Sequence, residues 1–104
     1  MATAMMMLGE KVSAERAFAM GMIYRVCAAG SLETESMALA GRLAEMPTRG
    51  LGLTKRLLNA SLSNDLNGQL DAEEAMQREA GHTHDFGEGV AAFREKRQPK
   101  FTGE

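Results

Sequence analysis

The amino-acid sequence predicts an all-α fold, and three observations support that prediction. Ala, Leu, Glu, Lys, Arg and Gln are plentiful, and these residues lose little rotamer freedom in a helix. Val and Ile, which favour strands, are scarce. Apolar residues recur at helical spacing in segments that begin at capping residues and end at Gly or Pro. A chain of 104 residues is long enough for one modest core, so we expect a single helical domain over residues 1–104 with five or six helices.

The first half of the chain carries signals for three helices. An apolar run ends at Gly9, and glycine commonly follows a helix. Ser13 is a good N-cap for a second helix that reaches about Met20. Ser31 is expected to cap a third helix that continues to about Glu45. The apolar stripe of this third helix comprises Leu32, Leu39, Leu43 and Met46.

The second half carries signals for three more helices. Pro47 separates the first of them, over about 48–62, from the helix before it. A turn cluster at 63–65 precedes the next helix, over about 66–80. Asp85 and Glu88 have the spacing of a capping box for a last helix, which Gln98-Pro99 stops. The inward faces are expected to hold Leu51, Leu58 and Leu62, with Leu53 and Leu57 beside them, and then Leu70, Met76 and Ala80.

Composition excludes some functional classes. The formal net charge of −2 gives no strong field for binding nucleic acid or an anionic membrane. Cys27 is the single cysteine, so no intrachain disulfide can form, and a reducing cytoplasm is the expected compartment. The apolar start is too short to span a bilayer and lacks the pattern of a signal peptide.

Two polar features are candidates for a metal or catalytic site. His82, His84 and Asp85 lie close together, but zinc needs three or four convergent ligands and the only other His or Cys is Cys27. We therefore interpret the cluster as polar residues at a helix start, with Asp85 acting as a cap. Cys27 has no neighbouring His and does not stand at a cationic helix start, which favours a structural cysteine over a nucleophile.

Two further segments could meet a phosphorylated ligand. The run from Gly50 to Lys55 resembles part of a phosphate loop, but it lacks the full motif and does not follow a strand. We expect its glycines to allow close helix–helix approach instead. The basic end of the last helix suits the helix dipole. Charge runs are usually solvated, so charge alone favours this account. The alternative is that the basic end meets phosphates, with Phe93 or Phe101 offering an apolar face to a purine; its residues are Arg94, Lys96, Arg97 and Lys100.

Three blocks in order resemble the crotonase superfamily, the enoyl-CoA hydratases and isomerases. The first is Met7-Leu8-Gly9-Glu10-Lys11-Val12-Ser13-Ala14-Glu15-Arg16-Ala17, followed by Gly21-Met22-Ile23. The second runs from Thr48 to Lys55 and continues to Asn59. The third comprises Asp85, Glu88-Gly89-Val90-Ala91-Ala92-Phe93, Lys96-Arg97, Pro99 and Phe101. Within the superfamily, Gly50-Leu51-Gly52-Leu53, Gln69-Leu70 and Phe101-Thr102-Gly103 are similar to the ring-epoxide isomerases of phenylacetate breakdown.

This resemblance implies a small helical C-terminal oligomerisation domain of the ClpP/crotonase-like fold, without the N-terminal ββα spiral. In that family the spiral holds the backbone N–H groups that polarise an acyl-CoA thioester and the carboxylates that move protons. Catalytic residues are therefore expected upstream of Met1 and none in this chain. By matching position, Phe93 would lie near the CoA adenine, and Lys96 near the adenine and phosphates. In the family this CoA often belongs to a neighbouring subunit, so we expect the two residues to face one.

The resemblance also implies partners. It implies an acyl-CoA substrate whose CoA moiety takes the place of a tightly bound cofactor, and a homo-oligomer, either a trimer or a dimer of trimers. Recurrent methionines that share faces with leucines fit such a subunit contact. The alternative is a stand-alone helical protein-binding module, which the caps, the apolar stripes and the basic end fit equally well.

Overall fold

The computed structural model describes residues 2–104, and these residues form six α-helices and one short 3-10 turn, with no strand. The all-α prediction is confirmed. The helices divide between two compact units, residues 1–36 and 37–104, each of which is described by itself. No helix among the described residues is both long enough and apolar enough to cross a membrane.

The first unit contains α1 (Ala2–Leu8), α2 (Ala14–Ala19) and the 3-10 turn η1 (Ala29–Ser31). Gly9 ends α1 as predicted, with φ +63° and its N–H donating to the Met5 carbonyl at 3.2 Å. Ser13 caps α2 as predicted, because its hydroxyl accepts the N–H of Arg16 at 3.2 Å. Gly21, at φ +72°, follows α2 in the left-handed conformation that glycine adopts without strain.

Helix α3 (Leu32–Ala44) spans the boundary between the units and begins differently from the prediction. Ser31 is the last residue of η1 and does not act as an N-cap. Its hydroxyl donates to the Ala28 carbonyl and to Glu35 Oε1, so η1 leads directly into α3. The residues of the predicted apolar stripe are largely exposed: Leu32, Leu39, Leu43 and Met46.

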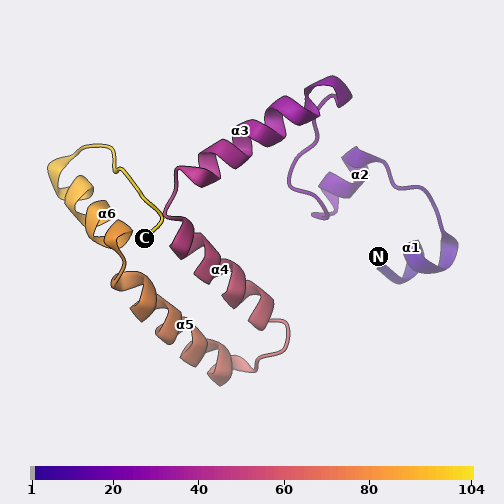
Figure 1. Ribbon diagram of the computed structural model, residues 1–104. Helices are drawn as coiled ribbons and strands as arrows, with labels where there is room; N and C mark the ends of the chain where they lie inside the picture. The colour runs from indigo at the N-terminus through magenta and orange to yellow at the C-terminus, as the bar shows by residue number, and fades with distance from the viewer. Residues whose placement is uncertain (1) are drawn as a thin grey trace. The chain divides into compact units, whose positions relative to one another are not determined.

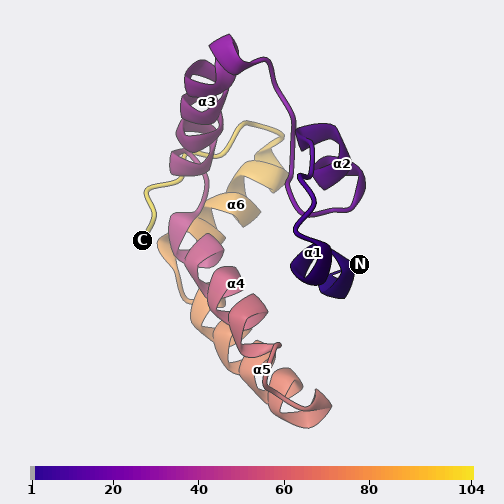
Figure 2. The ribbon, with the colours of Figure 1, turned by 90° about the vertical axis from the view of Figure 1, so that its right-hand side faces the viewer.

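Helices α4 (Thr48–Ala60) and α5 (Leu66–Gly81) form an antiparallel pair, side by side in both views (Figures 1 and 2). The turn between them ends at Asp65, whose carboxylate accepts the N–H of Gly68 at 2.8 Å and caps α5. Leu53 is buried between neighbours on the two helices. The inward face thus lies around Leu53 and not, as predicted, around Leu58 and Leu62, which are 65% and 88% exposed.

Helix α6 (His84–Glu95) contacts the end of α5, and residues 97–104 return alongside it as a tail without regular structure (Figure 1). Ala92 of α6 and Leu53 of α4 are the only buried apolar residues among those described. Most large apolar side chains are at least a third exposed. Leu70, predicted to point inward, is one of them, since it is 53% exposed.

Candidate functional site

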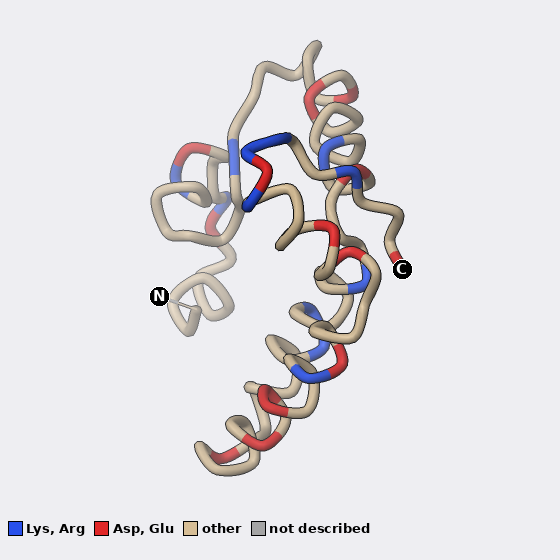
Figure 3. The backbone as a smooth tube through the Cα atoms, turned by 90° about the vertical axis from the view of Figure 1, so that its left-hand side faces the viewer, with Lys and Arg blue, Asp and Glu red and all other residues tan. Residues whose placement is uncertain are grey.

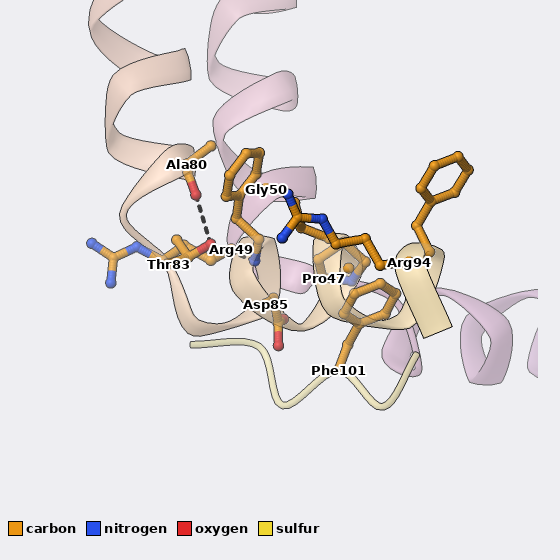
Figure 4. Close-up of a pocket in the computed structure, with 12 residues that line it drawn as sticks. Pro47, Arg49, Gly50, Ala80, Thr83, Asp85, Arg94 and Phe101 are labelled. Atoms are coloured by element: carbon orange, nitrogen blue, oxygen red, sulfur yellow. Dashed lines mark hydrogen bonds between the residues drawn. The ribbon is translucent and has the colours of Figure 1, made fainter. Parts of the chain in front are cut away.

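An apolar groove of about 500 Å³ opens between the start of α4, the end of α5 and the length of α6 (Figure 4). Phe101 of the tail closes one side of it. The Phe101 ring lies close to α6, 3.7 Å from the position a Cβ would take at Gly89, which is an ordinary van der Waals distance. The lining includes the arginines and aromatic residues Arg49, Arg94, Phe86, Phe93 and Phe101.

The two residues predicted to contact CoA lie at the end of α6. Phe93 is 85% exposed and lines the groove. Lys96 follows the helix in the left-handed conformation (φ 55°, ψ 39°) and is exposed. Within residues 2–104 the Lys96 ammonium forms no ion pair, so its charge is open to a ligand. Their contact with CoA stays a prediction.

Arg97, which the sequence grouped with the ligand-facing basic residues, is engaged inside the chain. Its guanidinium donates to both carboxylate oxygens of Glu88, at 2.6 and 2.8 Å, and to Glu95 at 2.6 Å. Such a bidentate pair is strong and directional. Figure 3 shows how acidic residues interrupt the basic ones in this part of the chain. The basic end is therefore a mixed cluster and not a uniform phosphate-binding patch.

Glu88 holds the tail at two points. Besides Arg97, Glu88 Oε1 accepts the backbone N–H of Lys100 at 2.6 Å. The hydrogen bonds from Arg97, followed by that from the Lys100 N–H, lower the pKa of Glu88 to about 2. Glu88 and then Glu95 in turn raise the pKa of Arg97 further above its ordinary value. Both groups are therefore charged throughout the physiological pH range.

Asp85 holds the end of the tail and is only 2% exposed. Its carboxylate points from the first turn of α6 towards the tail (Figure 4) and accepts the N–H groups of Thr102 at 2.7 Å and Gly103 at 2.8 Å. Its own N–H donates to the Glu104 carbonyl at 3.0 Å. Burial works to raise the pKa of Asp85, but these N–H donors outweigh it, so the pKa lies below its ordinary value.

The predicted capping box of Asp85 and Glu88 is wrong. Thr83 is the N-cap of α6, and its hydroxyl accepts the N–H of Phe86 at 3.1 Å. Asp85 therefore stands one position inside the helix start, where its carboxylate is available to the tail. Local spacing does not reveal that the Asp85 carboxylate is taken up by N–H groups 17 and 18 residues further along the chain.

The histidines near this helix start have separate surroundings. His82 Nδ1 lies 2.6 Å from the Arg78 carbonyl, whereas His84 Nδ1 lies 3.7 Å from Asp85 Oδ1 and 3.4 Å from the Thr102 hydroxyl. Among residues 2–104 no three His, Cys, Asp or Glu side chains gather as a metal-ligand group. Cys27 is half-buried.

The segment from Gly50 to Lys55 lies inside α4, so it is not a phosphate loop. The expected close helix approach at its glycines is not found in residues 2–104, because a Cβ added at Gly50 or Gly52 would meet nothing within 4 Å. Close approach occurs instead at Gly103 (φ +84°), where a Cβ would stand 2.5 Å from Thr48 Oγ1. No local pattern in the sequence signals that contact between the tail and α4.

Known proteins resemble this chain along nearly its whole length. It is 46% identical over 97 residues to 1,2-epoxyphenylacetyl-CoA isomerase of Escherichia coli, covering 93% of this chain and 37% of the relative. It is 35% identical to trans-2-decenoyl-(acyl-carrier-protein) isomerase of Streptococcus mutans, covering 98% of this chain and 39% of that protein. A crystal structure of an enoyl-CoA hydratase from Polaromonas sp. JS666 superposes with a TM-score of 0.90 at 35% sequence identity. The match covers 98% of this chain and 40% of that one.

The chain thus spans about two fifths of the length of the relatives it matches. The family described as enoyl-CoA hydratase/isomerase matches residues 1–104, a range that contains all three sequence blocks. On both the sequence and the structural comparison, this chain belongs to the enoyl-CoA hydratase/isomerase family.

Proposed function

We propose that this chain is the C-terminal helical region of an enzyme that acts on an acyl-CoA thioester through an enolate, by hydration or double-bond isomerisation. The observation that carries the proposal is the family match over residues 1–104, combined with coverage of only about two fifths of each relative. In this proposal the thioester-polarising N–H groups and the proton-moving carboxylates lie in the remainder of the enzyme. By analogy with the Escherichia coli relative, the parent enzyme would act in phenylacetate breakdown. The alternative setting is fatty-acid breakdown, and in either case we propose that the enzyme works in the cytoplasm.

We assign two roles to the helical region, and the first is subunit contact. Its apolar side chains are too exposed for a self-sufficient domain: Met6, Met7 and Leu62 are each more than 80% exposed. A second groove of about 560 Å³, lined by methionines and alanines of α1, α2 and the loop after it, is likewise open. Contiguous apolar surface of this kind is covered in functional proteins by a partner. We propose that other regions of the enzyme and further copies of it, in a trimer or a dimer of trimers, cover these faces.

The second role is to form a rim of the CoA site. Phe93 offers an exposed ring for stacking on adenine, and Lys96 an unpaired ammonium for phosphate. Both groups act on the nucleotide and neither reaches the thioester, so they should affect binding and leave the chemical step unchanged. In the full-length enzyme that contains this chain, Lys96→Ala and Phe93→Ala should raise KM for crotonyl-CoA about tenfold each, with kcat within about twofold of wild type.

The control substrate for crotonyl-CoA is crotonyl-pantetheine, which carries the same thioester without the nucleotide. Neither variant should change its KM. Loss of kcat for both substrates would contradict the rim assignment, since it would place these residues in the chemistry. The 104-residue chain alone should not hydrate crotonyl-CoA; turnover that disappears on changing one of its own carboxylates would overturn the proposal.

Self-association of the isolated chain provides a separate test of the first role. Sedimentation velocity across a wide concentration range should show association that grows with concentration, because the uncovered apolar faces meet. A monomer at every concentration would argue against the oligomer contacts and favour the stand-alone module.

A further inference from the structure

Lys96 adopts a backbone conformation that its side chain disfavours. It is the only non-glycine residue with positive φ among residues 2–104. The helix ends there in a Schellman arrangement, in which the Lys96 N–H donates to the Phe93 carbonyl at 3.3 Å and the Arg97 N–H to the Ala92 carbonyl at 3.0 Å. Glycine is usual at this position, because a Cβ makes the left-handed region unfavourable. A strained residue of this kind persists only when its surroundings hold it.

Glu88, a residue of α6, holds the chain around Lys96 in this conformation. Its two carboxylate oxygens accept hydrogen bonds from the Arg97 guanidinium on one side of the turn, and Oε1 also accepts the Lys100 N–H three residues further on. The Glu88 side chain is about 15% exposed, so water competes weakly for these bonds. The chain immediately after Lys96 is thereby tied at two points to the helix immediately before it.

The tie sets the direction of the Lys96 side chain. If the segment from Arg97 to Lys100 were released, Lys96 could relax to an ordinary right-handed or extended conformation, and its ammonium would leave its present position at the end of α6. Asp85 secures the same tail further along, through Thr102 and Gly103, but it is not adjacent to the turn. Of the two carboxylates, Glu88 is the one that holds the residues directly after Lys96, so its loss would release the turn itself.

We infer that Glu88 is a positioning residue for the CoA nucleotide: it acts through Arg97 and the Lys100 N–H to hold Lys96 where the ammonium meets the phosphates. This inference rests on the proposed function, since it needs Lys96 to contact CoA. Glu88 itself contacts no ligand in this assignment, because its oxygens are occupied within the chain. Its effect should therefore appear in affinity for the nucleotide and nowhere else.

The expected size follows from the conformational preference of Lys96. Without the tie, the binding-competent left-handed turn would be populated about five- to thirtyfold less, given the usual preference of L-residues against that region. Apparent affinity falls by the same factor as the competent fraction. Because Glu88 acts only through Lys96, its loss cannot cost more than the roughly tenfold expected of Lys96→Ala, so it should weaken CoA binding about five- to tenfold.

The experiment is a double-mutant cycle in the full-length enzyme, with Kd for coenzyme A and for pantetheine measured by isothermal titration calorimetry. The variants are Glu88→Gln, Lys96→Ala and the double variant. Glu88→Gln should weaken CoA binding in the wild-type background and have no further effect once Lys96 is alanine, because its route of action is then absent. Pantetheine binding should stay unchanged in all three.

Glu74→Gln is the matched control, since it removes an exposed carboxylate paired with Arg78 on α5, away from the tail. It should leave both affinities at the wild-type value. If Glu88→Gln does not fold, Arg97→Lys serves instead, because it keeps the charge and loses the bidentate geometry. It should show the same dependence on Lys96 with a smaller loss.

The outcomes separate the two proposals. Equal losses from Glu88→Gln with and without Lys96 would mean that Glu88 merely stabilises the fold, and the inference would be overturned. Undiminished CoA affinity in Glu88→Gln, beside a loss in Lys96→Ala, would overturn the inference and leave the proposed function standing. Undiminished affinity in Lys96→Ala would overturn the assignment of the CoA rim itself.

Discussion

Replacing Gly103 by alanine should open the tail, because two separate costs fall on that position. Gly103 has φ +84°, where an L-residue is disfavoured by about 1–2 kcal/mol. Its new Cβ would also stand 2.5 Å from Thr48 Oγ1, so Thr48 would have to leave its present rotamer. Moving a side chain off its rotamer costs about 0.5–1.5 kcal/mol. The sum, about 1.5–3.5 kcal/mol, should appear as easier opening of the tail.

Hydrogen exchange measures that opening directly. The N–H groups of Thr102 and Gly103 donate to buried Asp85 and are protected while the tail is closed. With Gly103→Ala, exchange of the Thr102 amide should accelerate about 10- to 300-fold, since each 1.4 kcal/mol is a factor of ten. Amides in the middle of α5 should be unaffected and serve as the internal reference.

A second substitution separates the two costs. Thr48→Ala removes Oγ1, and the Thr48 Cβ that remains would lie 3.9 Å from the new methyl group, an ordinary contact. Gly103→Ala combined with Thr48→Ala should therefore keep only the backbone cost of about 1–2 kcal/mol. Wild-type exchange in Gly103→Ala, or no recovery in the double variant, would refute the reasoning.

Three further predictions concern the packing, cap and pH dependence of the second unit. Leu53→Ala should lower the free energy of unfolding by about 2–4 kcal/mol in urea titration, because it removes a buried side chain, whereas Leu62→Ala should stay within about 0.5 kcal/mol. Thr83→Ala should cost about 1 kcal/mol in the same assay through loss of the α6 cap; no change would mean that another group replaces it. The pKa of Glu88 is lowered to about 2 in the folded chain. The stability that ionised Glu88 contributes to the fold should therefore be complete above about pH 4.3 and be lost as the pH falls towards about 2. The Lys100 amide chemical shift should follow that loss, and a titration midpoint near about 4.3 would contradict the assigned contacts.

Local signals in the sequence predicted the elements well. Gly9 and Ser13 each act as predicted, because a helix end depends on groups within a few residues of it. The error at Ser31 has a local cause as well. Its hydroxyl donates to Ala28 and Glu35 in a 3-10 turn, an alternative that capping preferences do not distinguish.

Contacts between distant segments of the chain could not be predicted in this way. The roles of Asp85 and Glu88 depend on backbone N–H groups 12 to 18 residues further along, which no helical periodicity relates to them. The inward face of α4 was predicted around Leu58 and Leu62, because apolar stripes identify a face that will be covered without identifying what covers it. Phe93 and Lys96 came from the family resemblance, since composition and spacing alone do not distinguish them from ordinary surface residues.

The left-handed turn at Lys96 also bears on how this chain could be engineered. A redesign guided only by thermal stability would choose glycine at position 96, since removing the Cβ relieves about 1 kcal/mol of backbone strain. The same substitution would delete the ammonium assigned to the CoA phosphates. Gains in melting temperature at this position should therefore coincide with weaker nucleotide binding, and heat-based screening of variants would select against the lysine that we assign to the CoA phosphates.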